Sequence, residues 1–171
     1  MKNAAYSFSD KEYGRVLDNF VVACVDVAVI YKDQILLENR TKHPDKGGWW
    51  IFGGRVHVGE SLQETAMRGL ERELGMKVGY DRIIKMGTYN LLWPIRREPT
   101  NKNGCHHLLV AHGIILTGEE YKTINNYILN NSIKARWFSL SDLEQELTEP
   151  NIKLLVSECK ELVEAQANIP F

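Results

Sequence analysis

A glycine-rich run followed by regularly spaced charged residues is the part of the sequence best suited to chemistry. It begins at Gly53-Gly54-Arg55, and its charged residues continue through Glu60, Glu64, Arg68, Glu71 and Glu73. Glycines let a backbone approach a ligand closely, and a nearby carboxylate can hold a hard cation such as Mg²⁺ that bridges phosphate oxygens. This combination indicates chemistry on a diphosphate.

The residues after this run predict a helix over 62–74. Ser61, followed three residues later by Glu64, is a capping-box pattern. Apolar residues then recur every four positions, at Leu62, Ala66, Leu70 and Leu74, which is a helical period. Gly75 is a suitable terminator. On such a helix, positions 69, 72 and 73 share one face.

The same segment resembles the signature of the Nudix hydrolase family, which reads Gly, five residues, Glu, seven residues, Arg-Glu-apolar-any-Glu-Glu-any-Gly-apolar. With Gly54 in first place, the agreement extends to Glu60, Arg68, Leu70, Glu73, Gly75 and Met76. Gly69 and Arg72 stand where the family usually has metal-binding glutamates. The resemblance covers roughly residues 20 to 145. It implies an α+β protein with the Nudix fold, an α/β/α sandwich around a mixed β-sheet.

Gly69 and Arg72, the two departures from the signature, affect how many metal ions the helix can bind. A complete signature presents three carboxylates on the helix face, whereas this chain presents Glu73 alone. Arg72 adds a positive charge beside it, which opposes loading of several divalent cations. We therefore expect one ion, Mg²⁺ or Mn²⁺, held by Glu73 and the Gly53 carbonyl. The resemblance adds the amide of Asn131. A single ion of this kind is suited to neutralising a diphosphate leaving group.

Within the family, the reduced signature resembles that of the GDP-mannose mannosyl hydrolases, which cleave the sugar–oxygen bond rather than the P–O–P bridge. The resemblance implies that the substrate is a nucleotide sugar, that Arg40 and Arg55 contact its diphosphate, and that the protein is a homodimer. Of the neighbouring Trp49 and Trp50, one is expected to anchor the core and the other to stack on a nucleobase, with Trp50 as the candidate.

The catalytic base is the point at which the resemblance fails. When the family pattern is aligned on Trp137, the family's histidine falls on Ser132, whose hydroxyl has no suitable pKa. No histidine occurs over 117–134, a segment that the resemblance implies is a long loop. The candidates for activating water are then His57 and one of the pair His106 and His107. Only one of that pair can point into a cleft, because adjacent strand residues face opposite ways.

Two other functions remain open. The first is cleavage of the P–O–P bridge, with Glu71 or a loop residue replacing the missing glutamates. The second, motivated by Ser132, is a sensor that binds a nucleotide sugar without turnover.

The rest of the chain supplies the elements that position these residues. The final helix is expected over 151–166, with an apolar face that packs on the core. The polar and basic segment 94–104 is expected to be a mobile loop and a possible clamp over the substrate. Alternating or continuous apolar runs predict strands over 21–30, 35–39, 83–93, 107–116 and 135–138.

The length and composition of the chain limit its possible domain count, partners and location. A chain of 171 residues with 44% hydrophobic content suits one domain over 1–171. Its 21 basic and 22 acidic residues are mixed along the chain, which argues against a nucleic-acid or membrane-surface partner. The longest apolar stretch, 20–31, is interrupted by Asp26 and is too short to span a bilayer. Three scattered cysteines and no secretory pattern predict a reducing cytoplasm.

Overall fold

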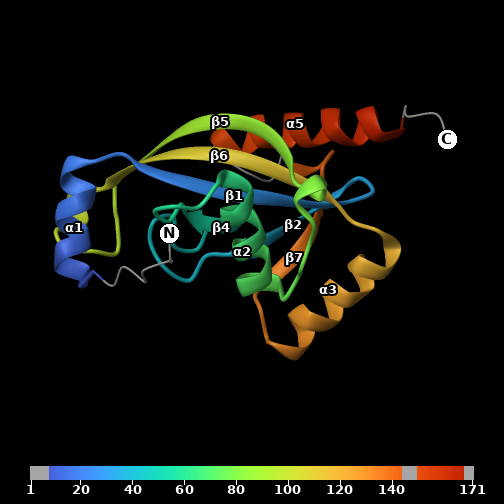
Figure 1. The fold of residues 1–171 in the computed structure, drawn as a ribbon, viewed down its shortest axis with the longest axis horizontal. Helices are drawn as coiled ribbons and strands as arrows, with labels where there is room; N and C mark the ends of the chain where they lie inside the picture. The colour runs from blue at the N-terminus through green and yellow to red at the C-terminus, as the bar shows by residue number, and fades with distance from the viewer. Residues whose placement is uncertain (1–7, 144–149, 168–171) are drawn as a thin grey trace.

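A mixed seven-stranded sheet forms the centre of the structure, a computed structural model that describes residues 8–143 and 150–167 (Figure 1). Its path is β3-β2-β1-β6-β5, with β4 paired to β1 and β7 paired to β2. Strands β1 and β6 run parallel, and the other described pairs are antiparallel. The strands are β1 (Val22–Tyr31), β2 (Gln34–Asn39), β3 (Trp49–Trp50), β4 (Phe52–Arg55), β5 (Ile84–Trp93), β6 (Cys105–Ile115) and β7 (Ala135–Ser139).

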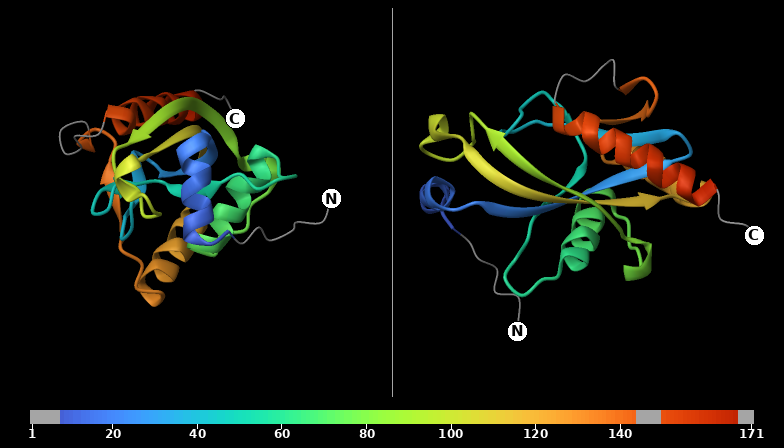
Figure 2. Two further views of the ribbon diagram at one scale, coloured as in Figure 1. Left: turned by 90° about the vertical axis from the view of Figure 1, so that its left-hand side faces the viewer. Right: turned by 90° about the horizontal axis from the view of Figure 1, so that it is seen from above.

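Helices cover both faces of this sheet. α2 (Leu62–Leu74) and α3 (Gly118–Asn130) pack on one face, and α5 (Pro150–Ala167) packs on the other (Figures 1 and 2). α1 (Asp10–Asn19) lies at one end of the sheet. The expected α/β/α sandwich with a mixed sheet is therefore confirmed. None of the described helices has the length and apolar character needed to cross a membrane.

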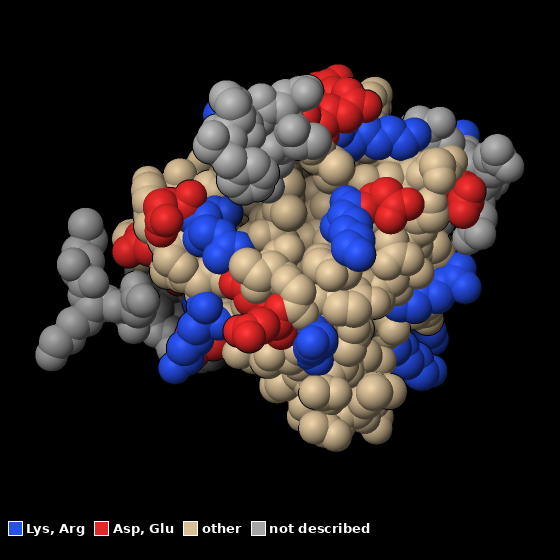
Figure 3. All heavy atoms as spheres, turned by 90° about the vertical axis from the view of Figure 1, so that its right-hand side faces the viewer, with Lys and Arg blue, Asp and Glu red and all other residues tan. Residues whose placement is uncertain are grey.

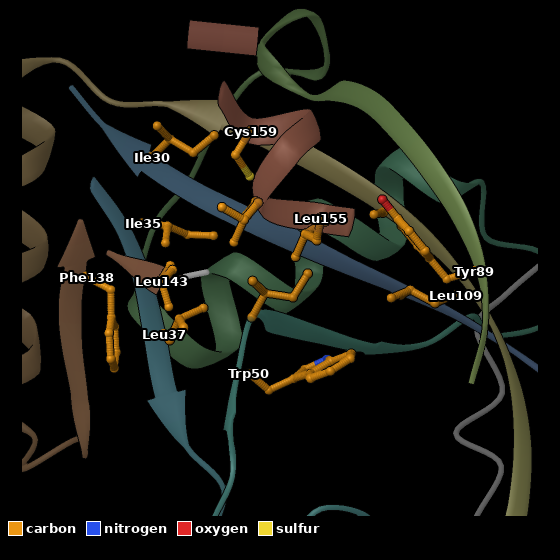
Figure 4. Close-up of a cluster of buried hydrophobic side chains, with 14 of the residues drawn as sticks. Ile30, Ile35, Leu37, Trp50, Tyr89, Leu109, Phe138, Leu143, Leu155 and Cys159 are labelled. Carbon is orange, nitrogen blue, oxygen red and sulfur yellow. The ribbon is translucent and has the colours of Figure 1, made fainter. Parts of the chain in front are cut away.

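The central strand β1 is buried on both faces, which explains why its sequence is almost continuously apolar. Val27 packs with Leu70 of α2 in one buried cluster. Ile30 packs with Leu155 and Cys159 of α5 in a second cluster on the opposite face (Figure 4). The sheet is thus clamped between two apolar layers, and its edges and ends are left to carry polar groups.

Five predicted strands and two predicted helices occur close to their expected bounds. Two α-helices of the described residues, α1 and α3, were not predicted. α1 precedes the first predicted strand, and α3 occupies most of the segment 117–134 that the resemblance treated as a long loop. Part of the glycine-rich run is also a strand, β4, which pairs with β1 from Cys24↔Arg55 to Val27↔Phe52.

The segment 94–104 is anchored, and the expectation of a mobile loop is wrong. Arg96 is 1% exposed. Its guanidinium donates to Asp18 Oδ1 at 2.7 Å and to the backbone oxygens of Gly104 at 2.8 Å and Pro99 at 3.1 Å. Gly14 of α1 lies directly against Pro99, because a Cβ built at Gly14 would be 1.7 Å from the Pro99 oxygen. The segment and α1 therefore form one packed unit at the end of the sheet.

The surface carries no large region of one charge on the face shown in Figure 3, where basic and acidic side chains are interspersed. This pattern matches the net charge of −1. Cys24, Cys105 and Cys159 are all buried and free.

Candidate active site

One pocket collects nearly all of the residues predicted from the sequence. It has a volume of about 440 Å³ and is lined by residues from α1, β1, β2, β4, α2, β6 and the segment 94–104. The predicted residues that line it are Arg40, Trp50, Gly53, Arg55, His57, Glu73 and His107.

Asn131 is not brought to this pocket by the structure. It caps the C-terminal end of α3, and its exposed side-chain amide donates to the Tyr127 oxygen at 2.9 Å. The resemblance had placed a metal ligand in a loop, whereas the chain forms a helix there.

Helix α2 is positioned by the local signals read from the sequence. Ser61 and Glu64 form the reciprocal capping box, and Gly75 ends the helix with a left-handed φ of 62°. Arg68 donates to both carboxylate oxygens of Glu60, at 2.7 and 2.9 Å, and this pairing lowers the pKa of Glu60 to about 2. This ion pair holds the loop that contains Glu60 against the helix.

Gly69 brings α2 unusually close to β4. A Cβ at this position would lie 3.2 Å from the Cα of Gly53, a contact tighter than most real Cβ atoms make. The absent carboxylate at position 69 thus coincides with a close helix–strand contact, which places the following turn of α2 beside the Gly53 backbone.

Glu73 and Gly53, the predicted metal ligands, are in contact with each other and with Arg72. The Gly53 N–H donates to Glu73 Oε2 at 3.0 Å. Arg72 Nη2 donates to the Gly53 carbonyl at 2.7 Å and also pairs with Glu73 Oε1. These contacts close a ring in which the guanidinium lies between the two groups expected to bind Mg²⁺.

The residues present do not fit a resident divalent metal in this arrangement. Both predicted donors are engaged by Arg72, and position 69 has no side chain. Among residues 8–143 and 150–167, no group of three or more His, Cys, Asp or Glu side chains is placed to hold a metal ion. Asp26 and Glu38 also line the pocket, where burial raises the pKa of each.

Arg40, directly after β2, and Arg55 of β4 line the pocket without a carboxylate partner within 4.0 Å among the described residues. The Arg40 Nε donates to the Pro44 oxygen at 2.9 Å, which fixes the side chain against the turn that follows β2. Arg55 lies over the ring of Tyr13, with its Cζ atom 4.0 Å from the ring centre. Two oriented guanidinium groups that lack an anion are the expected features of a phosphate-binding pocket.

His107 is the histidine of its pair that faces the pocket. His106 instead lies 3.2 Å from Asn90 Oδ1 on β5. Burial, together with the positive charges of Arg40 and Arg55, lowers the pKa of His107 to about 4. The imidazole is therefore neutral near neutral pH and available to accept a proton. His57 also lines the pocket, but its side chain is 55% exposed and lies 3.7 Å from Glu60.

Trp50 lines the pocket as part of its wall. It is only 3% exposed, packs edge-on against Trp93, and belongs to the core cluster shown in Figure 4. Its Nε1 donates to Asp26 Oδ2 at 2.8 Å. Little of the ring is left for a nucleobase, so the structure favours the core-anchoring role for Trp50.

The residues that sequence reasoning missed include Tyr13, Glu38 and Asp26. Tyr13 comes from an unpredicted helix, and Glu38 lies at an ordinary strand position. Asp26 had a signal, since a single carboxylate inside an apolar strand is expensive to bury and marks a position with a polar role.

The sequence is similar to known proteins of one domain family. The model of the NUDIX domain family matches residues 22–157. The chain is 29% identical over 80 residues to the low-salt glycan biosynthesis protein Agl8 of Haloferax volcanii, covering 47% of this chain and 50% of that protein. The chain spans half or less of the length of the curated relatives it matches.

Two solved structures illustrate the shared fold. The MutT NUDIX hydrolase from Burkholderia pseudomallei is 19% identical with a TM-score of 0.59, covering 82% of this chain and 98% of that one. The NUDIX domain of Shewanella oneidensis NrtR, crystallised with ADP ribose, is 17% identical with a TM-score of 0.55, covering 88% of this chain and 97% of that one.

Proposed function

Because this chain belongs to the Nudix family, whose domain model spans most of its length, we propose that it hydrolyses a nucleoside diphosphate derivative. The favoured substrate is a nucleotide sugar such as GDP-mannose, cleaved to a nucleoside diphosphate and a free sugar. The observation that carries the proposal is the pair Arg40 and Arg55, which face one pocket beside a neutral His107 without a carboxylate partner among the described residues.

The proposed reaction is attack of water on the anomeric carbon of the sugar. A new C–O bond forms from the water oxygen, and the bond from the anomeric carbon to the diphosphate oxygen breaks. The electron pair leaves with the nucleoside diphosphate, and the water proton passes to the base. Arg40 and Arg55 stabilise the departing diphosphate with planar charge-assisted hydrogen bonds, which strengthen as its negative charge grows.

His107 is the base favoured by the structure. It is neutral and partly buried at the pocket wall. The positive charges of Arg40 and Arg55 act on it and help to lower its pKa. His57 is the alternative base from the glycine-rich segment, at a more exposed position. The Mg²⁺ that Nudix hydrolases generally use stays outside this mechanism, because Arg72 holds both predicted ligands.

Two comparisons support a sugar nucleotide as the substrate class. Agl8 is named as a glycan biosynthesis protein, and the NrtR NUDIX domain was crystallised with ADP ribose, a nucleoside diphosphate joined to a sugar.

The test is product analysis by phosphorus NMR in ¹⁸O water with GDP-mannose and a panel of other nucleotide sugars. The proposal expects intact nucleoside diphosphate without the heavy isotope, and label on the sugar. A nucleoside monophosphate, or label on phosphorus, would instead establish cleavage of the P–O–P bridge. Each reaction is run with added Mg²⁺ and with EDTA.

The second candidate function is that of a sensor, which binds a nucleotide sugar without hydrolysing it. The engagement of Glu73 and Gly53 by Arg72 favours it, as does Ser132 at the position of the family's base. A nucleotide sugar that raises the melting temperature yet stays intact throughout incubation would identify this function.

The proposal includes the expected homodimer. Val21, Leu92 and Leu108 are exposed apolar side chains. The strand register places Leu92 and Leu108 diagonally on one face, at the end of the sheet where β1 begins. Light scattering on the intact chain measures the mass, and Leu92→Glu is expected to convert a dimer to a monomer.

A further inference from the structure

Arg72 occupies the position between the Gly53 carbonyl and the Glu73 carboxylate, where a single metal ion was expected. Its Nη2 atom serves both acceptors, with 2.7 Å to the carbonyl oxygen. The Gly53 N–H holds the other carboxylate oxygen at 3.0 Å. The guanidinium is thus fixed by a closed ring of hydrogen bonds rather than extended into solvent.

The strand beneath Arg72 leaves room for this placement. A Cβ at Gly54 would be 3.3 Å from Arg72 Nη2 and 3.6 Å from Nη1, so a side chain at position 54 would press on the guanidinium. Gly69 allows the close approach of α2 to Gly53 that brings Arg72 within reach. Two glycines therefore shape the space around one cation.

Arg72 also has N–H donors that make no hydrogen bond within the described part of the chain. An arginine side chain carries five N–H groups, and the contacts to Gly53 and Glu73 both use Nη2. Nε and Nη1 make no hydrogen bond to any residue of the described part of the chain, and Arg72 lines the pocket with its side chain 49% exposed. These N–H groups can bind phosphate oxygens.

We propose that Arg72 takes the place of the divalent metal, so that the pocket binds a diphosphate through Arg40, Arg55 and Arg72 without a metal ion. The inference rests on the proposed function, because it assumes that the pocket takes a diphosphate. It explains why position 72 carries a cation where the family signature has a carboxylate. It also explains why position 69, a glycine, carries no carboxylate. Glu73 then acts as a positioning residue that holds Arg72.

The first test measures diphosphate binding by calorimetry, with ADP, GDP and UDP as probes, in EDTA and in Mg²⁺. The wild-type chain is expected to bind at least one probe in EDTA, with less than about a two-fold change on adding Mg²⁺. Arg72→Gln is expected to weaken binding in EDTA by about ten-fold or more, and Arg72→Lys by less, because the point charge remains. Arg82→Gln removes an arginine paired with Glu120 away from the pocket and serves as the matched control.

The second test follows Mn²⁺ binding by electron paramagnetic resonance without any nucleotide. The wild-type chain is expected to leave the signal of free Mn²⁺ unchanged. Arg72→Glu, which removes the resident cation and adds a carboxylate beside Glu73, is expected to gain binding, and a further Glu73→Gln change should abolish the gain.

Either of two results would overturn the inference. The first is tight Mn²⁺ binding by the wild-type chain. The second is diphosphate binding that Mg²⁺ strengthens ten-fold or more (~1.4 kcal/mol). Either result would show that the site binds a metal ion. In that case the proposed function would stand. Failure of all three probes in both conditions would remove the inference and the proposed function together.

Discussion

The guanidinium of Arg55 lies over the ring of Tyr13, with 4.0 Å between Cζ and the ring centre. This contact links β4 to α1, a helix that precedes the matched Nudix segment. Burial raises the pKa of the Tyr13 hydroxyl, so the ring stays neutral beneath the cation. α1 therefore orients one of the two arginines on which the proposed function depends.

Removing the Tyr13 ring is expected to weaken substrate binding. A cation–π contact of this kind contributes about 0.5–2 kcal/mol, so Tyr13→Ala should raise KM or Kd roughly two- to thirty-fold. Tyr13→Phe keeps the ring and should stay close to wild type. Tyr80→Ala, at a side chain 60% exposed, is the control. Equal KM or Kd values for the Phe and Ala variants would show that the ring does not position Arg55.

The pKa of His107 is expected to rise when a diphosphate binds. In the free pocket it is lowered to about 4 by burial and by the charges of Arg40 and Arg55. A bound anion offsets those charges and lets the pKa move back towards its ordinary value of about 6.5. NMR titration of the His107 ring with and without GDP measures the shift. An unchanged titration in saturating GDP would contradict the proposed geometry.

The same shift predicts the pH dependence of turnover. The base must be neutral, so activity falls as His107 becomes protonated at low pH. The acidic limb of kcat/KM reports the free protein and should lie near the lowered value, whereas the limb of kcat reports the complex and should lie at higher pH. Limbs in the reverse order would exclude His107 as the base.

Asp26 is expected to reduce stability near neutral pH. Burial raises its pKa from 3.8 to about 6, so the folded state binds the proton more tightly than the unfolded state. Its contribution to stability is present below pH 3.8 and is lost as the pH rises through about 6. Asp26→Asn should therefore raise the free energy of unfolding near neutral pH by on the order of 1–3 kcal/mol. Urea unfolding at several pH values gives the measurement, and a variant less stable than wild type at neutral pH would refute this account.

The contact between α1 and the segment 94–104 is expected to be sensitive to one methyl group. A Cβ at Gly14 would fall 1.7 Å from the Pro99 oxygen, so Gly14→Ala should destabilise the fold by about 1–3 kcal/mol. Because α1 carries Tyr13, the variant should also bind substrate more weakly. The control is Gly118→Ala at the start of α3, where the nearest atom is 3.7 Å away. Thermal unfolding should separate the two variants clearly.

Local sequence signals located most elements of the fold. The capping box of Ser61 and Glu64 marked the start of α2, and apolar runs marked the long strands. The same capping pattern recurs at Ser9 with Glu12 and at Thr117 with Glu120, where α1 and α3 begin. The resemblance had suggested a loop over 117–134, and that expectation outweighed a signal present in the chain.

The segment 94–104 was read as mobile because its residues are polar and basic. Composition cannot distinguish a solvated arginine from a buried one whose donors are all satisfied. Arg96 belongs to the second kind, and its partner Asp18 lies 78 positions away in the sequence. Such a distant contact becomes visible only when the chain is folded.

The sequence by itself determined the family signature and the course of α2, because these depend on spacing along the chain. The resemblance singled out Arg40 and Arg55, and the sequence left His57, His106 and His107 as the candidate bases. It also showed that Arg72 replaces a carboxylate. Where the Arg72 guanidinium lies was decided by the tertiary structure, since a long flexible side chain takes its direction from its partners. The close contact of Gly69 with Gly53 brings α2 to β4, and only then can Arg72 reach the Gly53 carbonyl.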